Sequence, residues 1–483
     1  MINEIIYNIK KYKNRDAFNI SNSYYTYEQL GNRIVEIQQE ILKHHTKKPI
    51  VIIYDDNFDT YASILAILFL GVGFVPINHR NPIDRNKKII DKTEAELIIN
   101  TTLSQYSVSY NEIKSLDIIK VDNKIVCEIA DTSLAYIFFT SGSTGEPKGV
   151  PIRVSNLNTF LNGFNDLALN INYNDKFLQM FELSFDLSVF SYLYPLTIGA
   201  CVYTVPNIGL KYGEILKTLT KKEITIALMV PSIINYLKPY FKQIKLPHLK
   251  YSLFCGEALI KDVAVDWNKC IPNAITYNVY GPTEATIFCT SYKVEADAKQ
   301  YNGIVSIGKP MKGTELSITT NNIIEGEFNN DSKGELIIIG NQVADEYFKN
   351  KSKTLECFFK QDNKNSYRTG DICFVDGEND YFYVGRIDSQ VQIQGFRVEL
   401  SEIEHAITIN FNVNSSVITV ENNTKVIAFV DAEINTEDVL TKLKNILPSY
   451  MIPKKIVILD KLPLNNNGKI DKKKLKEYAE FNI

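Results

Sequence analysis

Short apolar runs recur along the first part of the chain, and many are rich in β-branched or aromatic residues. They occupy positions 49–54, 96–100, 134–140, 201–205, 224–230, 251–256 and 274–281. Between several of them lie stretches with helical spacing, such as 57–71 and 212–222. Continuous apolar strands that alternate with helices are typical of largely parallel sheets covered on both faces. The pattern therefore predicts an α/β fold.

The longest apolar run, 61–75, is shorter than the ~20 residues that a membrane helix needs and contains glycines. It predicts a buried helix followed by a turn, and no membrane insertion. The first 18 residues mix charges with apolar side chains, which is not the pattern of a secretory signal. We therefore expect a cytoplasmic protein.

The pattern changes from about residue 310, where shorter strands and polar turns predict a β-rich subdomain. A small α+β segment follows: a strand or loop at 389–400, a helix that Ser401 and Glu404 would cap, a strand at 426–434 and a last helix. We place a boundary at Asp388. The expected domains are a large one, 1–387, and a small mobile one, 388–483.

Composition narrows the class of protein. The 483 residues exceed what one core usually organises, and a net charge of −3 gives no reason to expect nucleic acid or an anionic membrane as partner. The seven cysteines are scattered without a C-x-x-C pair, which indicates reduced thiols and neither disulfides nor zinc.

The loop TSGSTGEPKG, residues 140–149, has glycines, hydroxyls and one lysine that could surround phosphates. It is not a Walker loop, because Glu146 and Pro147 separate Gly145 from Lys148. Proline disfavours helix in the residue before it, so the chain should stay extended after Gly145. The loop alone leaves open a flexible polar hairpin without a ligand.

Companion segments follow in a fixed order. They are YTYEQL at 25–30, FLGVGFVPINHRNPIDR at 69–85, NVYGPTEATI at 278–287, YRTGD at 367–371, GRIDSQVQIQGFRVELSEIE at 385–404 and NNNGKIDKKKL at 465–475. With the loop they span nearly the whole chain. The ordered set resembles the adenylate-forming superfamily of acyl- and aminoacyl-activating enzymes, including the adenylation domains of peptide synthetases.

The resemblance implies a binding site for ATP and Mg²⁺. Tyr280 would stack on adenine, Asp371 would accept both ribose hydroxyls, and Glu284 would hold the metal ion. Lys469 would be catalytic, together with Thr283 and Glu284, by stabilising charge on the attacking carboxylate and the α-phosphate. The residues implied to bind ATP or AMP are Thr140, Ser141, Gly142, Ser143, Thr144, Gly145, Lys148, Asn278, Tyr280, Gly281, Thr283, Asp371, Tyr383 and Arg386.

The segment FELSFDLSVF, 181–190, bears on the acid that is activated. A buried carboxylate without a partner is costly, and a substrate ammonium would suit Asp186. In amino-acid-activating relatives the matching residue pairs with the α-amine; otherwise Asp186 would be a helix cap or a surface residue. Bulky walls favour a small substrate side chain. The residues implied to line the pocket are Asp186, Leu187, Phe190, Leu228, Leu253, Cys255, Val279, Ile287, Phe288 and Lys469.

The compact length and the segments FDLSV, FCGEAL, YGPTEAT and ELSEIEH resemble the stand-alone D-alanine:carrier-protein ligases. Cys255 matches a cysteine in that group's pocket. The chain departs from the pattern at Phe190 and Phe288, which are larger than expected, and at three polar positions. These are Asn78, where relatives often have Asp, and Gln392 and Gln394, where basic residues are common.

The resemblance implies two half-reactions in a monomer. ATP and a small amino acid, D-alanine by preference, give aminoacyl-AMP; a rotation at the hinge Asp388 then admits a thiol. Because the sequence ends soon after Lys469, we expect the thiol on the phosphopantetheine arm of a separate acyl carrier protein. The alternatives are a CoA ligase for another carboxylic acid, an adenylation enzyme for a different amino acid in nonribosomal peptide synthesis, and a non-catalytic nucleotide-binding scaffold.

Overall fold

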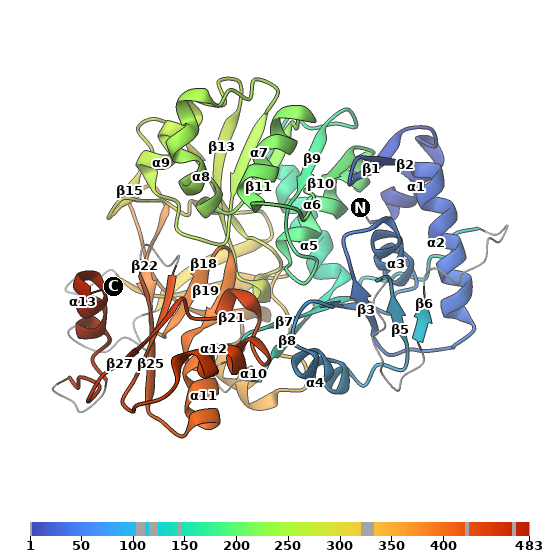
Figure 1. Ribbon diagram of the computed structural model, residues 1–483. Coiled ribbons are helices and arrows are strands. Elements are labelled where there is room, and N and C mark those ends of the chain that lie inside the picture. The colour runs from blue at the N-terminus through green and yellow to red at the C-terminus, as the bar shows by residue number, and fades with distance from the viewer. Residues whose placement is uncertain are drawn as a thin grey trace. The chain divides into compact units, whose positions relative to one another are not determined.

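The computed structural model describes residues 2–102, 112–114, 124–142, 146–319, 333–420, 425–465 and 470–482. The chain divides into two compact units (Figure 1). The first comprises Met1–Asn78, Thr93–Phe138 and Gly149–Ile387, and the second comprises His79–Lys92, Phe139–Lys148 and Asp388–Ile483. Two short segments thus group with the C-terminal residues. The expected domains 1–387 and 388–483 stay a prediction.

The first unit contains a large sheet with the strand order β17-β14-β13-β12-β11-β9-β10-β1-β2. Its central pairs are parallel, and antiparallel pairs lie toward both ends. The expected α/β class is confirmed. The strands are β1 (Asp16–Ile20), β2 (Ser23–Thr26), β9 (Lys176–Gln179), β10 (Cys201–Thr204), β11 (Ile226–Met229), β12 (Tyr251–Phe254), β13 (Ile275–Tyr280), β14 (Thr290–Val294) and β17 (Lys309–Pro310).

A second sheet has the order β6-β5-β3-β4-β7-β8, and its pairs around β3, β4 and β5 are parallel. Strands β7 and β8 flank the glycine-rich loop, so the loop leaves one strand at Thr140 and enters the next at Lys148. The chain is therefore extended from Lys148 onward, whereas Gly145, from which the extended chain was predicted, lies outside the described residues. The strands are β3 (Ile50–Tyr54), β4 (Phe74–Asn78), β5 (Ile98–Asn100), β6 (Glu112–Lys114), β7 (Leu134–Thr140) and β8 (Lys148–Arg153).

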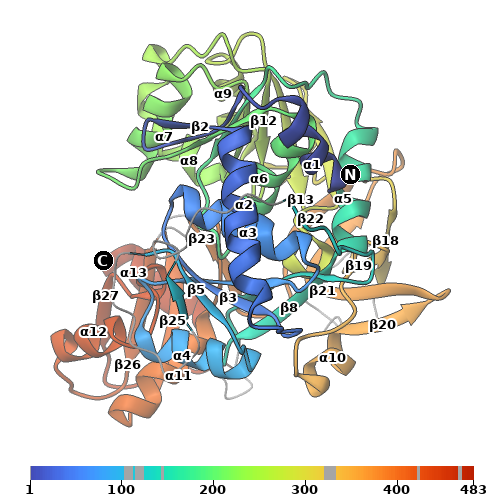
Figure 2. The ribbon, with the colours of Figure 1, turned by 90° about the vertical axis from the view of Figure 1, so that its right-hand side faces the viewer.

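Helices pack on these sheets. The predicted apolar helix is α3, which Asn57 caps by accepting a hydrogen bond from the Thr60 N–H at 3.0 Å. It ends before Gly71 and Gly73, whose positive φ angles form the predicted turn. Helix α2 runs beside α3 (Figure 2). The helices of this unit are α1 (Asn3–Lys11), α2 (Tyr27–Leu42), α3 (Phe58–Phe69), α5 (Val154–Asp166), α6 (Leu187–Ile198), α7 (Lys211–Lys221), α8 (Pro231–Leu237), α9 (Lys261–Asn268) and α10 (Lys351–Cys357), with the 3₁₀ turns η2 (Lys238–Gln243) and η3 (Thr283–Ala285).

The predicted β-rich subdomain is an antiparallel sheet with the order β18-β19-β21-β20, in which β22 pairs with β21. A short pair, β15-β16, precedes it. The strands are β15 (Gln300–Tyr301), β16 (Ile304–Val305), β18 (Thr314–Thr319), β19 (Gly334–Gly340), β20 (Phe358–Gln361), β21 (Lys364–Val375) and β22 (Tyr381–Arg386).

The second unit holds a hairpin of β23 and β24, a sheet β25-β26-β27 and several helices. The predicted capping box was wrong: α11 starts at Leu400 with Glu399 in the cap position, while the Glu404 carboxylate accepts a hydrogen bond from the Val417 N–H at 2.8 Å. The elements are α4 (Ile83–Thr93), β23 (Gln390–Ile393), β24 (Phe396–Glu399), α11 (Leu400–Phe411), β25 (Ser415–Val420), β26 (Lys425–Val430), α12 (Thr436–Lys444), η4 (Ser449–Met451), β27 (Lys455–Ile458) and α13 (Lys472–Asn482).

Among the residues that the structure describes, no helix combines the length and the hydropathy required to cross a membrane. The apolar run at 61–75 instead supplies buried side chains to the large core of the first unit. The second unit has apolar cores of its own, built around α11 and the strands β25 and β26.

Candidate functional site

Three of the expected nucleotide residues converge in the first unit. Tyr280 ends β13, while Asp371 in β21 pairs in register with Arg386 in β22. The Tyr280 hydroxyl donates to Asp371 Oδ2 at 2.5 Å, and Arg386 Nη1 donates to Asp371 Oδ1 at 2.6 Å. A carboxylate oxygen has lone pairs for more than one donor, so Asp371 can still accept a ribose hydroxyl.

The Asp371 carboxylate is held in place by its own strand. Gly370 adopts a left-handed backbone with φ +71°, and the Asp371 N–H donates to Thr369 Oγ1 at 3.0 Å. Burial and the neighbouring carboxylate raise the pKa of Tyr280 well above its ordinary value. The phenol is therefore a hydrogen-bond donor at neutral pH.

Three further residues expected to bind the nucleotide belong to the same strands or follow them directly. Asn278 in β13 is buried, and its Nδ2 donates to the Ser306 carbonyl at 2.9 Å and more weakly to the Val305 carbonyl at 3.4 Å. Tyr383 is a half-buried residue of β22. A Cβ on Gly281 would meet the backbone of Phe288 at 2.5 Å, so only glycine fits there.

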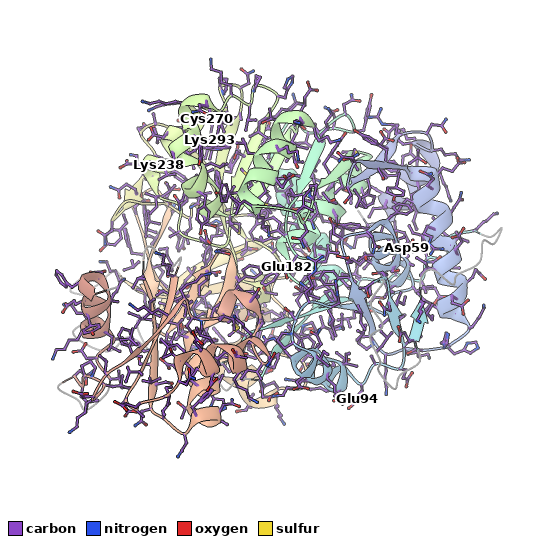
Figure 3. The ribbon with its side chains drawn as sticks, in the orientation of Figure 1. Asp59, Glu94, Glu182, Lys238, Cys270 and Lys293 are labelled. Atoms are coloured by element: carbon purple, nitrogen blue, oxygen red, sulfur yellow. The ribbon has the colours of Figure 1, made fainter. Side chains whose placement is uncertain are left out.

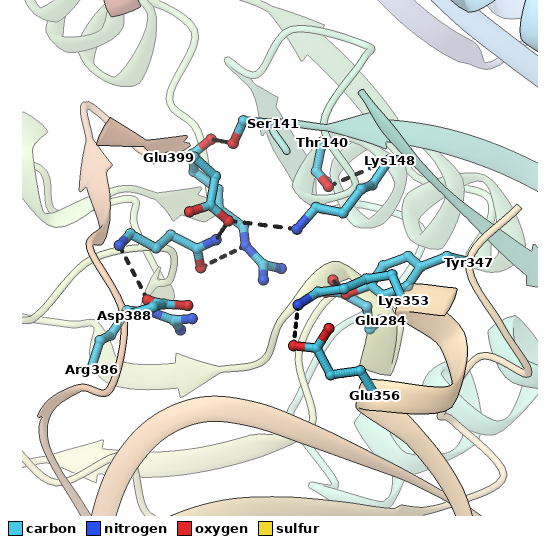
Figure 4. A network of polar contacts seen from close by, with 12 residues as sticks. Thr140, Ser141, Lys148, Glu284, Tyr347, Lys353, Glu356, Arg386, Asp388 and Glu399 are labelled. Atoms are coloured by element: carbon cyan, nitrogen blue, oxygen red, sulfur yellow. Dashed lines mark hydrogen bonds and ion pairs between the residues drawn. The ribbon is translucent and has the colours of Figure 1, made fainter. Parts of the chain in front are cut away.

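Glu284 lies in η3, directly after Thr283, and its side chain is fully buried. Its Oε1 accepts a hydrogen bond from the Tyr347 hydroxyl at 2.7 Å (Figure 4), and Tyr347 in turn lies 3.1 Å from the Tyr367 hydroxyl. The Glu284 backbone carbonyl accepts from the Ala344 N–H at 2.8 Å. Glu284 is thus held once through its carboxylate and once through its backbone.

Asp186 is 7% exposed and precedes α6, but its side chain makes no capping hydrogen bond. Its Oδ2 atom has no hydrogen-bond partner among the described residues. Burial, and to a smaller extent the nearby Glu284 carboxylate, raise the pKa of Asp186 to about 7, although the Thr283 hydroxyl opposes the shift. The reading of Asp186 as a helix cap is therefore not supported.

Every expected pocket residue that the structure describes is buried. The rings of Phe190 and Phe288 lie 5.5 Å apart in edge-to-face contact. Phe164 and Phe160 pack against them at 4.8 and 4.9 Å respectively. The expected pocket residues found buried are Leu187, Phe190, Leu228, Leu253, Cys255, Val279, Ile287 and Phe288.

Two polar residues, Cys255 and Asn78, are each influenced by a neighbouring carboxyl group. Burial and the Asp186 carboxylate raise the pKa of Cys255, so its thiol stays protonated. Asn78 donates from Nδ2 to Glu182 Oε2 at 2.9 Å; Figure 3 labels Glu182. An aspartate at position 78 would instead face a like charge, which explains this departure from the pattern of related sequences.

The glycine-rich loop contacts the β23–β24 hairpin within the second unit. Lys148 Nζ lies 3.5 Å from Glu399 Oε1, and both side chains are less than 10% exposed. Ser141 Oγ donates to the Arg397 carbonyl at 2.8 Å, while Thr140 Oγ1 donates to the Lys148 carbonyl at 3.5 Å (Figure 4). The loop glycine Gly142 has no room for a Cβ, which would lie 2.1 Å from the Glu146 carbonyl oxygen.

Four expected residues lie outside the described residues: Ser143, Thr144, Gly145 and Lys469. Asp388, the expected hinge, begins the C-terminal segment of the second unit and accepts a hydrogen bond at Oδ1 from the Gln390 N–H at 3.1 Å. The roles given to all of these residues stay predictions.

Several residues that hold the site were not identified from the sequence. Tyr347 and Gln342 come from the connection between β19 and α10, and Glu399 comes from the end of β24. Each is a buried polar side chain. The one available signal was a glutamine placed among apolar residues directly after the strand GELIIIG.

Five of the seven cysteines are buried. One of these is Cys270, near the end of α9 (Figure 3), where burial raises the pKa of the thiol to about 11. The described residues contain no group of three or more histidine, cysteine, aspartate or glutamate side chains that could hold a metal ion by themselves.

Comparison with known proteins identifies the family. The model described as "AMP-binding enzyme" matches residues 7–348. The D-alanine--D-alanyl carrier protein ligase of Lactococcus lactis subsp. lactis (strain IL1403) is 32% identical over 480 residues, with 93% of each chain covered. The protein of the same name from Staphylococcus aureus (strain Newman) is 34% identical over 472 residues, covering 94% of this chain and 93% of the relative.

Solved structures share the fold. The Vibrio cholerae adenylation domain AlmE, in complex with glycyl-adenosine-5'-phosphate, has a TM-score of 0.88 at 24% identity, covering 99% of this chain and 97% of that one. Holo-PA1221, an NRPS protein containing adenylation and PCP domains, has a TM-score of 0.86 at 21% identity, covering 98% and 83%. The resemblance drawn from the sequence motifs is confirmed: this chain belongs to the AMP-binding enzyme family, together with the D-alanine--D-alanyl carrier protein ligases.

Proposed function

We propose that this enzyme uses ATP to convert a small amino acid, D-alanine by preference, to aminoacyl-AMP and then transfers the aminoacyl group to a carrier-protein thiol. The observation that carries the proposal is Asp186, a buried carboxylate with one oxygen that has no hydrogen-bond partner among the described residues. The names of relatives that align over nearly the whole chain point to the same substrate and partner.

The α-ammonium of an amino acid supplies what Asp186 lacks. A cation next to a buried carboxylate favours its ionised form, so substrate binding lowers a pKa that burial has raised to about 7. The rings of Phe190 and Phe288 occupy space beside the site, which favours a methyl over a large side chain. A carboxylic acid without an amine leaves the Asp186 charge uncompensated.

The residues present fit ATP with Mg²⁺. The described residues form no metal cage, and Mg²⁺ commonly binds one or two carboxylates together with substrate phosphates. Glu284, a fixed and buried oxygen donor, suits that role. When bound, the ion neutralises charge on the phosphates. Thr283 and Lys148 would contact phosphate oxygens, and Tyr280, Asp371 and Arg386 would hold the nucleoside.

The reaction then needs two attacks. In the first, a carboxylate oxygen of the amino acid bonds to the α-phosphorus and pyrophosphate leaves; Lys469 would stabilise the charge that develops. In the second, a phosphopantetheine thiolate bonds to the carbonyl carbon of the mixed anhydride and AMP leaves. A rotation at Asp388 between the steps would move Lys469 away from the active site and bring the β23–β24 hairpin to it.

Amino-acid-dependent exchange of pyrophosphate into ATP tests the first step. The wild type should exchange with D-alanine, and Asp186→Asn should raise the KM for D-alanine by roughly a hundredfold with a much smaller change in the KM for ATP. Asp175→Asn is the matched control, because Asp175 is a buried carboxylate of the same unit that pairs with Lys250 at 2.7 Å. Equal KM values in the Asp186 and Asp175 variants would refute the role of Asp186.

The alternative acceptor is CoA. A thioester assay with one purified carrier protein bearing phosphopantetheine and, separately, with CoA distinguishes the two, and we expect transfer to the carrier. The competing activities, CoA ligation of another acid and adenylation of a larger amino acid, predict exchange with those acids in place of alanine.

A further inference from the structure

The turn that follows η3 is strained. Thr286 and Ile287 have φ angles of +57° and +74°, which β-branched residues rarely adopt. Both side chains are buried, and Ile287 is one of the pocket walls. Strained backbone persists only where surrounding structure holds it. The turn therefore requires hydrogen bonds from other residues to hold its backbone.

Gln342 supplies these hydrogen bonds, and we call its side chain the brace of the turn. It is fully buried in the connection between β19 and α10. Its Nε2 atom lies 2.9, 3.0 and 2.6 Å from the carbonyl oxygens of Ala285, Thr286 and Phe288. In the opposite direction, the Thr286 hydroxyl donates a hydrogen bond through Oγ1 to the Gln342 backbone carbonyl at 2.6 Å. The two N–H groups of one side-chain amide are thus shared among three carbonyl oxygens on both sides of the turn.

The brace is itself fixed. Thr314 Oγ1 donates to Gln342 Oε1 at 3.3 Å, which orients the amide. On the other side, Asn156 Nδ2 in α5 donates to the Asn341 and Val343 carbonyls at 2.8 and 3.1 Å. Gln342 is therefore a rigid support.

The turn connects the brace to Asp186. The Ile287 backbone N–H interacts with the Asp186 carboxylate and lowers its pKa. Directly after it, Phe288 contacts Phe190 and Phe160. A change in the turn would move an apolar wall and a polar contact of the pocket together.

We propose that Gln342 is a positioning residue that determines which amino acids are accepted, by holding the strained turn so that Ile287 and Phe288 close the pocket beside Asp186. This inference rests on the proposed function. It predicts that loss of the amide weakens binding of a small amino acid and relaxes the discrimination against larger ones, with little effect on ATP.

The test compares Gln342→Met with Gln38→Met. Gln38 in α2 is also fully buried and binds backbone groups, through Nε2 to the Val126 carbonyl and through Oε1 to the Val126 N–H, both at 2.8 Å. Both variants lose buried hydrogen bonds, so both should lose stability. Only Gln342→Met should raise the KM for D-alanine, by about tenfold, and reduce its preference over leucine by at least about tenfold in pyrophosphate exchange.

Hydrogen exchange of the backbone amides at 284–290 gives a readout independent of activity. Gln342→Met should speed their exchange at least about tenfold, and Gln38→Met should not. Unchanged exchange at 284–290, or faster exchange with unchanged preference between alanine and leucine, would overturn the proposal. If Gln342→Met does not fold, Thr286→Val removes one bond of the same brace without changing shape, and the same results are expected from it.

The two hypotheses fail differently. A wild type that exchanges pyrophosphate with no amino acid would refute the proposed function and, with it, the role of Gln342 in selectivity. Hydrogen exchange would still determine whether Gln342 holds the turn.

Discussion

The charge of Asp186 depends on pH because the folded chain solvates this carboxylate poorly. Its pKa of about 7 lies above the ordinary value of 3.8, so the folded state binds a proton that the unfolded state has released between these two values. The contribution of Asp186 to stability therefore falls as pH rises from about 4 to about 7. Above about pH 7 the ionised Asp186 destabilises the folded state by the full free energy that corresponds to its pKa shift.

Asp186→Asn should consequently stabilise the substrate-free protein at pH 8 and much less at pH 5. The gain at pH 8 should reach up to about 4 kcal/mol, the free energy that corresponds to the shift from 3.8 to about 7. Urea denaturation at the two pH values measures it. A variant less stable than the wild type at pH 8 would contradict the account.

Asp371 should act on the nucleotide alone. Its two oxygens are held by Tyr280 and Arg386, so the remaining lone pairs are fixed in direction. Asp371→Asn should raise the KM for ATP by about tenfold or more, because an amide cannot accept at both positions, and should leave the KM for D-alanine nearly unchanged. An equal rise in both KM values would show that Asp371 is structural.

Among the elements of the second unit, α4 and α11 are joined by one buried ion pair. Arg85 Nη1 lies 2.5 Å from Glu402 Oε1, with the side chains 8% and 2% exposed. Removing one member of a buried pair leaves an uncompensated charge, whereas replacing both is often tolerated. The pair therefore specifies how α4 meets α11 more than it adds stability.

Arg85→Met should lower the stability of the protein by about 3 kcal/mol or more, and Arg85→Met with Glu402→Leu should recover most of the loss. Chemical denaturation followed by circular dichroism checks both variants. A double variant no more stable than Arg85→Met would contradict this interpretation.

Elements with a continuous apolar surface could be predicted from the sequence, but the buried polar residues that hold the site could not. The runs at 251–256 and 274–281 became β12 and β13, because burial on both faces leaves an unbroken apolar pattern. The family resemblance indicated Asp371 and Tyr280. Gln342 and Glu399 were not identified, because a buried polar side chain that binds a distant backbone group or a distant lysine leaves no periodic pattern in the sequence. The capping box at Ser401 failed because Glu404 bonds to β25 instead.

At the scale of the whole molecule, the glycine-rich loop and the β23–β24 hairpin belong to one compact unit. Lys148, expected to bind phosphate, faces Glu399 at 3.5 Å, and Gln390 Nε2 also donates to Glu399 at 2.7 Å. If Lys148 binds phosphate, as proposed, ATP phosphates and this carboxylate would compete for one ammonium.

Glu399→Gln should lower the KM for ATP in pyrophosphate exchange by about three- to tenfold, because Lys148 is then no longer neutralised. Glu404→Gln is the matched control, since Glu404 pairs with Lys472 at 2.8 Å in the same unit and should leave the KM unchanged. A KM for ATP that rises in Glu399→Gln would oppose this competition.

The central claim is that the chain activates a small amino acid through Asp186. The most direct measurement is mass spectrometry of the adenylate formed when the enzyme receives ATP, Mg²⁺ and an equimolar mixture of deuterium-labelled D-alanine, unlabelled L-alanine, glycine, serine, phenylalanine, benzoate and a fatty acid; the label separates the two alanyl adenylates by mass. The account predicts D-alanyl-AMP as the main product with the wild type, and its loss with Asp186→Asn. A benzoyl, fatty acyl or phenylalanyl adenylate as the main product would contradict it.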